Sequence, residues 1–187
     1  MKQIFVTALL MGSVACYSVA QVTDSTTTAT TGADVMTTGS ELSSDSRQFM
    51  DKAATSGKLE VELGKMAQEK ASSQEVKDFG QRMVTDHSKA NEDLKALAQE
   101  KNVTLPDALT AKQQRNVDKL SGLSGEEFDQ AYMKMMVKDH NKDVSTFQKA
   151  SENLQDPAVK DFAAKTLPVL KEHQQMAKDI NGQMSNS

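Results

Sequence analysis

Residues 76–97 read VKDFGQRMVTDHSKANEDLKAL, and the spacing of apolar side chains in this stretch predicts a long amphipathic helix. Apolar residues recur every three or four positions, which is the period of an α-helix. The stripe consists of Val76, Phe79, Met83, His87, Ala90, Leu94 and Leu97. His87 is its polar member, and a polar side chain on the buried side of a helix needs a partner. This residue therefore marks a candidate polar site inside the fold.

The segment around His87 occurs a second time in the chain. Residues 83–89 read MVTDHSK, and residues 136–142 read MVKDHNK. The second copy places His140 on an apolar stripe in the same way, and His173 is the third histidine of the sequence. All three histidines are expected near the middle of a helix.

Three further stretches have the helical period. The first runs from about Ser46 to Lys70, and its stripe is Phe49, Ala53, Gly57, Glu60, Gly64 and Ala67. The next follows Gly125 and presents Phe128, Tyr132, Met136, His140, Val144, Phe147 and Leu154. The last begins at Asp156-Pro157, a favoured cap and first-turn pair, and presents Val159, Phe162, Ala163, Thr166, Leu170, His173, Met176, Ala177 and Ile180.

The connections between these helices indicate their topology. Short links join the first helix to the second, with Ser72 or Ser73 as the expected cap, and the third long helix to the fourth, so each pair is expected to form an antiparallel hairpin. Residues 102–124 separate the hairpins and contain a short helical pattern from Ala108 to Leu120. A helix of about 26 residues is roughly 39 Å long, which this connection can cover. We therefore predict an all-α, ferritin-like four-helix bundle with a long crossover containing a short extra helix.

The two ends of the chain differ in composition from the expected bundle at 45–181. Residues 1–20 have a lysine, an apolar run and small residues before Gln21, which is typical of a secretory signal peptide. Cys16 offers an alternative, since residues 13–16 loosely resemble a lipoprotein box and would carry a lipid anchor. Residues 21–44 are half Ser or Thr and predict a disordered linker, and residues 182–187 are expected to be a flexible tail.

Composition excludes several functional classes. The formal net charge of −4, without a basic cluster, argues against nucleic-acid binding. No segment after the signal peptide is apolar enough to span a membrane. The expected location is therefore the periplasm or cell envelope, and the partner is left open between an envelope protein and a second copy of the chain.

Four polar side chains are candidates for one site. Glu60, His87, His140 and His173 each lie near the midpoint of an expected helix and on its apolar stripe. One carboxylate and three imidazoles suit one divalent transition metal ion. Asp86 and Asp139 precede their histidines by one residue, about 100° round the helix, and would support the site from a neighbouring helix.

Two other interpretations use the same residues. The imidazoles and carboxylates can form a buried hydrogen-bond network without a metal, and on sequence alone this structural role is slightly favoured. Met83, Met136 and Met176 lie close to the histidines in sequence and could add thioether ligands, although methionine is also a common core residue.

Five blocks of the sequence resemble a family of bacterial domains of unknown function, family 4142. They are residues 60–67, 83–87, 120–132, 137–140 and 167–173. Members of that family are often labelled outer membrane proteins and are grouped with ferritin-like folds. The resemblance covers about residues 45–180 and implies an exported helical bundle, but it implies no established activity.

The sequence departs from di-iron ferritin chemistry. Di-iron bundles place a glutamate three residues before each histidine, whereas Val84, Val137 and Leu170 occupy these positions. No hydrolase or phosphate-loop motif occurs either. Two hypotheses follow: a non-enzymatic envelope protein whose polar cluster is structural, or a mononuclear metal-binding or redox protein that uses the four residues.

Overall fold

The computed structural model describes residues 42–186. The expectations for the signal peptide, Cys16 and most of the linker fall outside the described residues. The described part is all-α and contains α1 (Ser44–Lys70), α2 (Gln74–Glu100), α3 (Ala111–Ser121), α4 (Gly125–Asn153) and α5 (Pro157–Ser185). The predicted fold class, a helical bundle with an extra helix in the crossover, is confirmed.

Local sequence explains where three of the helices begin. The Asp156 side chain accepts hydrogen bonds from the backbone N–H groups of Ala158 and Val159, and Pro157 occupies the first turn of α5. Thr110 and Gln113 form a reciprocal capping box at the start of α3. The Ser43 side chain accepts from the Ser46 N–H at the start of α1. These caps satisfy backbone donors that a helix leaves unpaired at its first turn.

The helix α2 begins differently from the sequence expectation. Ser73 is its N-cap residue, but the Ser73 side chain makes no capping hydrogen bond. Instead, the buried Asp129 of α4 accepts from the Ser73 N–H at 2.8 Å and from the Ser72 N–H and hydroxyl at 3.2 and 2.6 Å. A residue from another helix therefore caps α2, which ties the two hairpins together at this end.

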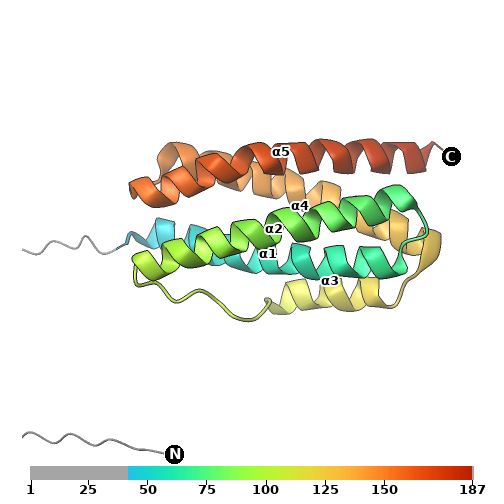
Figure 1. The fold of residues 1–187 in the computed structure, drawn as a ribbon, viewed down its shortest axis with the longest axis horizontal. Helices are drawn as coiled ribbons and strands as arrows, with labels where there is room; N and C mark the ends of the chain where they lie inside the picture. Colours follow the sequence, from blue (N-terminus) through green and yellow to red (C-terminus); the bar gives the residue numbers. More distant parts are fainter. Residues whose placement is uncertain (1–41, 187) are drawn as a thin grey trace, which may run out of the picture. The chain divides into compact units, whose positions relative to one another are not determined.

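The long helices form two antiparallel hairpins, α1–α2 and α4–α5 (Figure 1). The crossover leaves α2 at one end of the bundle and returns to the other end, so α2 and α4 run in the same direction (Figure 1). Across the hairpins, α2 contacts α5 and α1 contacts α4. The short helix α3 packs against α1 and α4. This is the topology predicted from the long connection.

The helices α1 and α2 approach each other closely at two glycines. A Cβ atom added to Gly64 would lie 2.7 Å from the Gly80 carbonyl oxygen, and one added to Gly80 would lie 2.8 Å from both the Gly64 carbonyl oxygen and the Ala67 Cβ. Because both contacts involve backbone, a larger residue would push the two helices apart.

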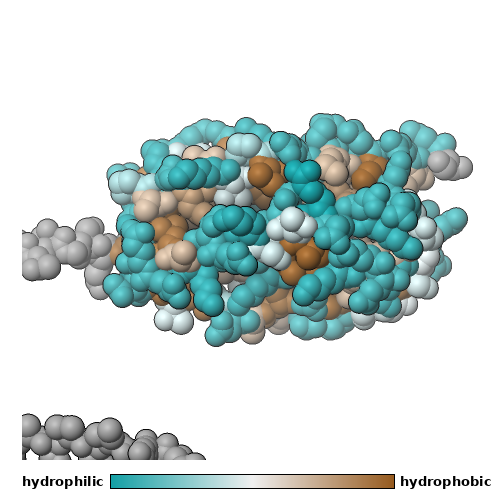
Figure 2. All heavy atoms as spheres, viewed as in Figure 1, coloured by the Kyte–Doolittle hydropathy of each residue, from teal (hydrophilic) through white to brown (hydrophobic). Residues whose placement is uncertain are grey.

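The apolar core is divided into two clusters. One cluster contains Phe49, Met50, Leu94, Leu97, Phe147, Val159, Leu167 and Leu170 among others. The second contains Leu63, Phe79, Met83, Leu120, Phe128, Tyr132, Met133 and Met136 among others. Hydrophilic side chains cover most of the face shown in Figure 2, with small apolar areas between them. Burial of these two clusters is the main stabilising contribution that sequence patterning dictates.

The C-terminal end is more regular than expected. The predicted flexible tail at 182–187 is wrong for most of its length, because α5 continues to Ser185. Met184 packs against the second apolar cluster, and the Ser185 hydroxyl donates to the Asn181 carbonyl. These contacts offset the helix-weakening effect of Gly182.

Candidate functional site

A layer of polar side chains lies in the middle of the bundle, with members from all four long helices. Glu60 comes from α1, His87 from α2, His140 from α4 and His173 from α5. Their exposed fractions are 2%, 5%, 0% and 0% respectively. The neighbouring imidazole centroids are 5.3 to 5.8 Å apart. The equal mid-helix positions seen in the sequence therefore correspond to real proximity.

Each imidazole uses one ring nitrogen to hold its orientation. His87 Nδ1 lies 3.0 Å from Glu60 Oε2, and His140 Nδ1 lies 3.0 Å from the Met136 carbonyl oxygen. His173 Nε2 lies 2.8 Å from Asp86 Oδ2. Because carboxylate and carbonyl oxygens accept hydrogen bonds, these nitrogens are the donors. The proton of each neutral ring is thereby placed on the nitrogen that faces outward from the cluster.

The second nitrogen of each ring is buried and has no hydrogen-bond partner. These atoms are His87 Nε2, His140 Nε2 and His173 Nδ1. The three histidines each offer a ligand nitrogen, and the offered nitrogens all lie within 4.8 Å of one another. With their protons committed elsewhere, the inner nitrogens carry lone pairs. Three acceptors therefore meet in the core without a donor.

The electrostatic surroundings keep the histidines neutral. Burial, followed by the neighbouring His140 and His173, lowers the pKa of His87 to about 3. Burial and His173 lower the pKa of His140 to about 4. Burial also lowers the pKa of His173, although the Asp86 carboxylate opposes this effect. Neutral imidazole is the form that binds metal ions.

A chain of hydrogen bonds and ion pairs connects His173 through Asp86 to exposed residues. Arg82 donates a hydrogen bond to Asp86 and pairs with Glu172 at 3.1 Å. Burial acts to raise the pKa of Asp86, but the hydrogen bonds from Arg82 and His173 lower it overall. A carboxylate that stays ionised is a strong acceptor for the His173 N–H.

The acidic side chains of Glu60 and Asp143 lie buried next to each other on the other side of the layer. Burial, followed by Asp143 and Asp139, raises the pKa of Glu60 well above its usual value. Burial and Asp139 raise the pKa of Asp143 to about 7. Burial raises the pKa of Tyr132 as well, with Glu60 adding to the effect, and the Tyr132 hydroxyl has no partner. These carboxyls therefore hold protons at a higher pH than ordinary acids do.

The four predicted site residues converge, but Glu60 differs in its position. We expected Glu60 as a fourth ligand, whereas its Oε2 lies 3.0 Å from the outer nitrogen of His87 and its Oε1 lies 3.6 Å from the outer nitrogen of His140. Glu60 therefore lies on the outer side of the His87 and His140 rings and helps to fix their orientation. Asp86 of α2 lies beside His173 of the neighbouring helix α5.

The contacts of two acidic residues, Asp139 and Asp143, differ from those expected from the sequence. Asp139 makes no contact with a histidine that parallels the one made by Asp86, and its buried Oδ2 has no partner. Asp143 was not identified from the sequence, although its side chain is only 7% exposed beside Glu60. Its spacing, three residues after His140 and four before Phe147, is the helical spacing that would have indicated it.

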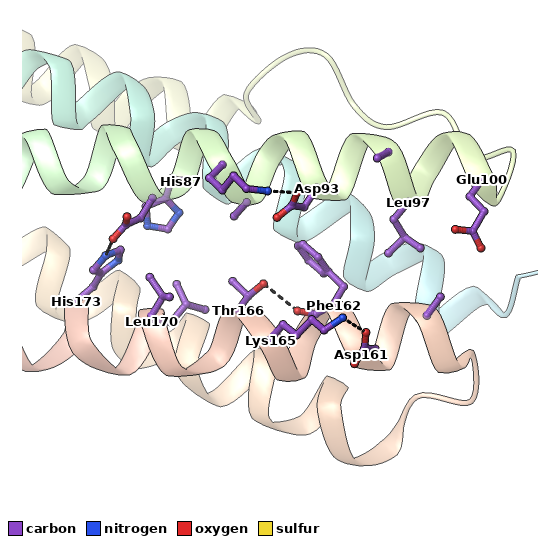
Figure 3. A pocket seen from close by; sticks show the side chains of 16 residues that line it. His87, Asp93, Leu97, Glu100, Asp161, Phe162, Lys165, Thr166, Leu170 and His173 are labelled. Carbon is purple, nitrogen blue, oxygen red and sulfur yellow. Dashed lines mark hydrogen bonds and ion pairs between the residues drawn. The ribbon is translucent and has the colours of Figure 1, made fainter.

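A surface groove leads to the layer between α2 and α5. It has a volume of about 600 Å³, and Figure 3 shows His87 and His173 at one end, with Leu97, Glu100 and Asp161 towards the other. Lys89 pairs with Asp93 on α2, and Lys165 pairs with Asp161 at 2.6 Å on α5.

Among residues 42–186, no helix is long and apolar enough to cross a membrane.

Two solved structures share this fold. A DUF305 fragment from Deinococcus radiodurans is 13% identical, with a TM-score of 0.67, and the match covers 76% of this chain and 98% of that one. A DUF305 protein from Streptomyces coelicolor, described as secreted, is 12% identical, with a TM-score of 0.65 and coverage of 76% and 96%. No curated protein matches the sequence. The model of the domain of unknown function DUF4142 matches residues 31–180, and the chain therefore belongs to the DUF4142 family.

Proposed function

We propose that this protein binds one divalent transition metal ion through His87, His140 and His173, and that it does so as an exported protein of the periplasm or cell envelope. One observation carries the proposal. Three buried imidazole nitrogens without hydrogen-bond partners belong to rings whose offered ligand atoms lie within 4.8 Å of one another. Three lone pairs facing one another repel unless a cation or a proton donor lies between them.

The support of the rings favours a metal site. Metal-binding histidines commonly donate their other N–H to a carboxylate or a backbone carbonyl, which fixes the ring and raises its basicity. Glu60, the Met136 carbonyl and Asp86 are such acceptors for the three rings. The lowered pKa of His87 and His140 also means that little proton competition occurs at neutral pH.

The donor set indicates which ions fit. Three neutral imidazoles are typical ligands for Zn²⁺ and Cu²⁺, and a three-histidine Zn²⁺ site usually leaves its fourth position for water or another ligand. In this site the ionised Asp86 carboxylate supplies negative charge behind His173. We assign the protein no reaction, because binding is what the described residues support.

The alternative is a structural hydrogen-bond network without a metal, which the sequence slightly favoured. Such a network would stabilise the bundle by pairing its buried polar groups. The three unpartnered imidazole nitrogens make it the weaker explanation. Export rests on the signal-like residues 1–20 and on the structural relative described as secreted.

Metal titration of the purified mature protein tests the proposal. After chelation and dialysis, Zn²⁺ and Cu²⁺ are titrated separately by calorimetry, and the metal content is measured by elemental analysis. We expect one ion per chain. Because an ion that binds only the folded state stabilises it by about 2.7 kcal/mol at one hundred times its dissociation constant, the Tm should rise by about 8 °C for a domain of this size.

The variant His140→Ala should lose this metal-dependent increment. Met133→Ala is the matched control, because Met133 is fully buried on the same helix but lies in the apolar cluster. It should lower the Tm and leave the stoichiometry at one. Absence of a metal-dependent shift in the wild-type protein would refute the metal site, and a lowered Tm of His140→Ala irrespective of metal would then support the structural network.

A further inference from the structure

The two sides of the bundle give unequal access to the polar layer. The seam between α1 and α4 is covered by α3, which contacts both helices. The seam between α2 and α5 contains the groove with His87 and His173 in its lining (Figure 3). These two residues come from the helices that form the groove, whereas His140 comes from α4. The groove therefore approaches two of the three proposed ligands directly.

The two sides of the bundle also differ in the net charge of the residues that line them. The α2–α5 groove is lined by the carboxylates of Asp86, Asp93, Glu100 and Asp161 and by two lysines, Lys89 and Lys165. The cavity on the other side, next to α3, is lined by four lysines, two carboxylates and no histidine. Its charged residues are Lys52, Lys112, Lys138, Lys142, Asp139 and Asp143. The groove thus has an excess of negative charge, and the opposite cavity an excess of positive charge.

We propose that the α2–α5 groove is the route by which a hydrated divalent cation reaches the three histidines, an inference that rests on the proposed metal site. A cleft lined by one sign of charge concentrates ions of the opposite sign and raises their association rate. The small side chains of Ala90, Ala96 and Ala158 keep the groove open along its length. His87 is 5% exposed and His173 is fully buried, so small side-chain movements at the inner end complete the route.

The lysines of the groove do not cancel this attraction. Lys89 is paired with Asp93 and Lys165 with Asp161, so each lysine charge is balanced by a carboxylate of the same helix. The other two carboxylates of the lining, Asp86 and Glu100, lie one at each end of the groove on α2, and the cations that pair with them, Arg82 and Lys101, are not part of the lining. A cation therefore meets an acidic residue at the outer end and another beside His173.

The rate of zinc uptake tests the route. The metal-free mature protein is mixed with Zn²⁺ in a stopped-flow instrument, and a zinc-responsive dye reports the free ion at low and moderate ionic strength. The double variant Asp93→Asn/Asp161→Asn should take up Zn²⁺ about three- to tenfold more slowly at low salt. It should still bind one ion at equilibrium, with a weaker dependence of the rate on salt. The control Glu62→Gln/Glu69→Gln removes the same charge from exposed positions of α1 and should keep the wild-type rate.

A second variant blocks the groove without changing its charge. Ala90→Leu adds bulk next to His87 and should slow both uptake and release of Zn²⁺, with an unchanged dissociation constant. Wild-type uptake rates in both groove variants, with one ion bound at equilibrium, would overturn the route and leave the metal site intact. A wild-type protein that binds no Zn²⁺ at equilibrium would refute the site and the route together.

Discussion

Replacement of Asp129 should destabilise the bundle more than any exposed acid does, because this side chain caps a helix from a distance. Asp129 is 1% exposed and accepts hydrogen bonds from two backbone N–H groups and a hydroxyl at the start of α2. Hydrogen bonds to a charged group contribute about 1.5–3 kcal/mol each. An anion at a helix N-terminus adds roughly 0.3–1 kcal/mol.

The expected loss is smaller than the sum of these contributions. Ser72 is exposed, so water can replace part of what Asp129 provides. We expect Asp129→Ala to lower the free energy of unfolding by about 3–4 kcal/mol, and the Tm by about 10 °C. Asp129→Asn keeps an acceptor oxygen and loses only the charge, so its loss should be about 1–2 kcal/mol.

Urea denaturation of the mature protein, followed by circular dichroism, measures both values. Glu62→Ala is the control, since Glu62 is exposed on α1 and its replacement should change the free energy by less than about 0.5 kcal/mol. A loss below about 1 kcal/mol for Asp129→Ala would contradict the capping role. Equal losses for the Ala and Asn variants would show that a neutral acceptor oxygen contributes nothing and that the charge accounts for the whole effect.

Two further predictions concern the acid pair and export. Because burial raises the folded-state pKa of Asp143 to about 7, the folded state holds a proton that the unfolded state loses, and stability falls as pH rises from about 4 to about 7. The free energy of unfolding of Asp143→Asn, measured relative to that of the wild type by denaturation, should therefore rise by about 2 kcal/mol between pH 5 and pH 8. A variant whose difference from the wild type is the same at pH 5 and pH 8 would contradict this. Intact mass of protein recovered from the cell envelope should correspond to a chain beginning at Gln21, whereas a lipid-modified Cys16 at the terminus would establish the anchor instead.

Helical spacing predicted most of the fold and the convergence of the site. The stripes that carry His87, His140 and His173 were visible because apolar neighbours recur at three- and four-residue intervals. Because the hairpin links are short, the paired helices are aligned end to end, and residues near the middle of each helix were expected at the same level along the bundle. The crossover helix was expected a few residues early, because the capping box of Thr110 and Gln113 was not recognised.

The order of contacts within the layer could not be predicted in this way. Spacing places Glu60 near the histidines, but which ring nitrogen it contacts depends on side-chain rotamers and on the offset between α1 and α2. The buried acids Asp129 and Asp143 were missed for another reason. An acid is assigned to the solvated side of a helix by default. Contacts across the hairpins show that Asp129 is inward, whereas the spacing of Asp143 from His140 and Phe147 would have indicated its position.

The division of the apolar core by the polar layer bears on how cooperatively the bundle unfolds. The two clusters, one around Phe147 and one around Phe79, lie on either side of the layer and share the four long helices. Unfolding units often coincide with such separately packed regions. A shared ion would bind ligands from α2, α4 and α5 at once, so its loss would weaken the link between the two halves. The metal-free protein should then open at one end while the other stays folded, which amide hydrogen exchange would detect as two groups of protected sites that merge when Zn²⁺ is added.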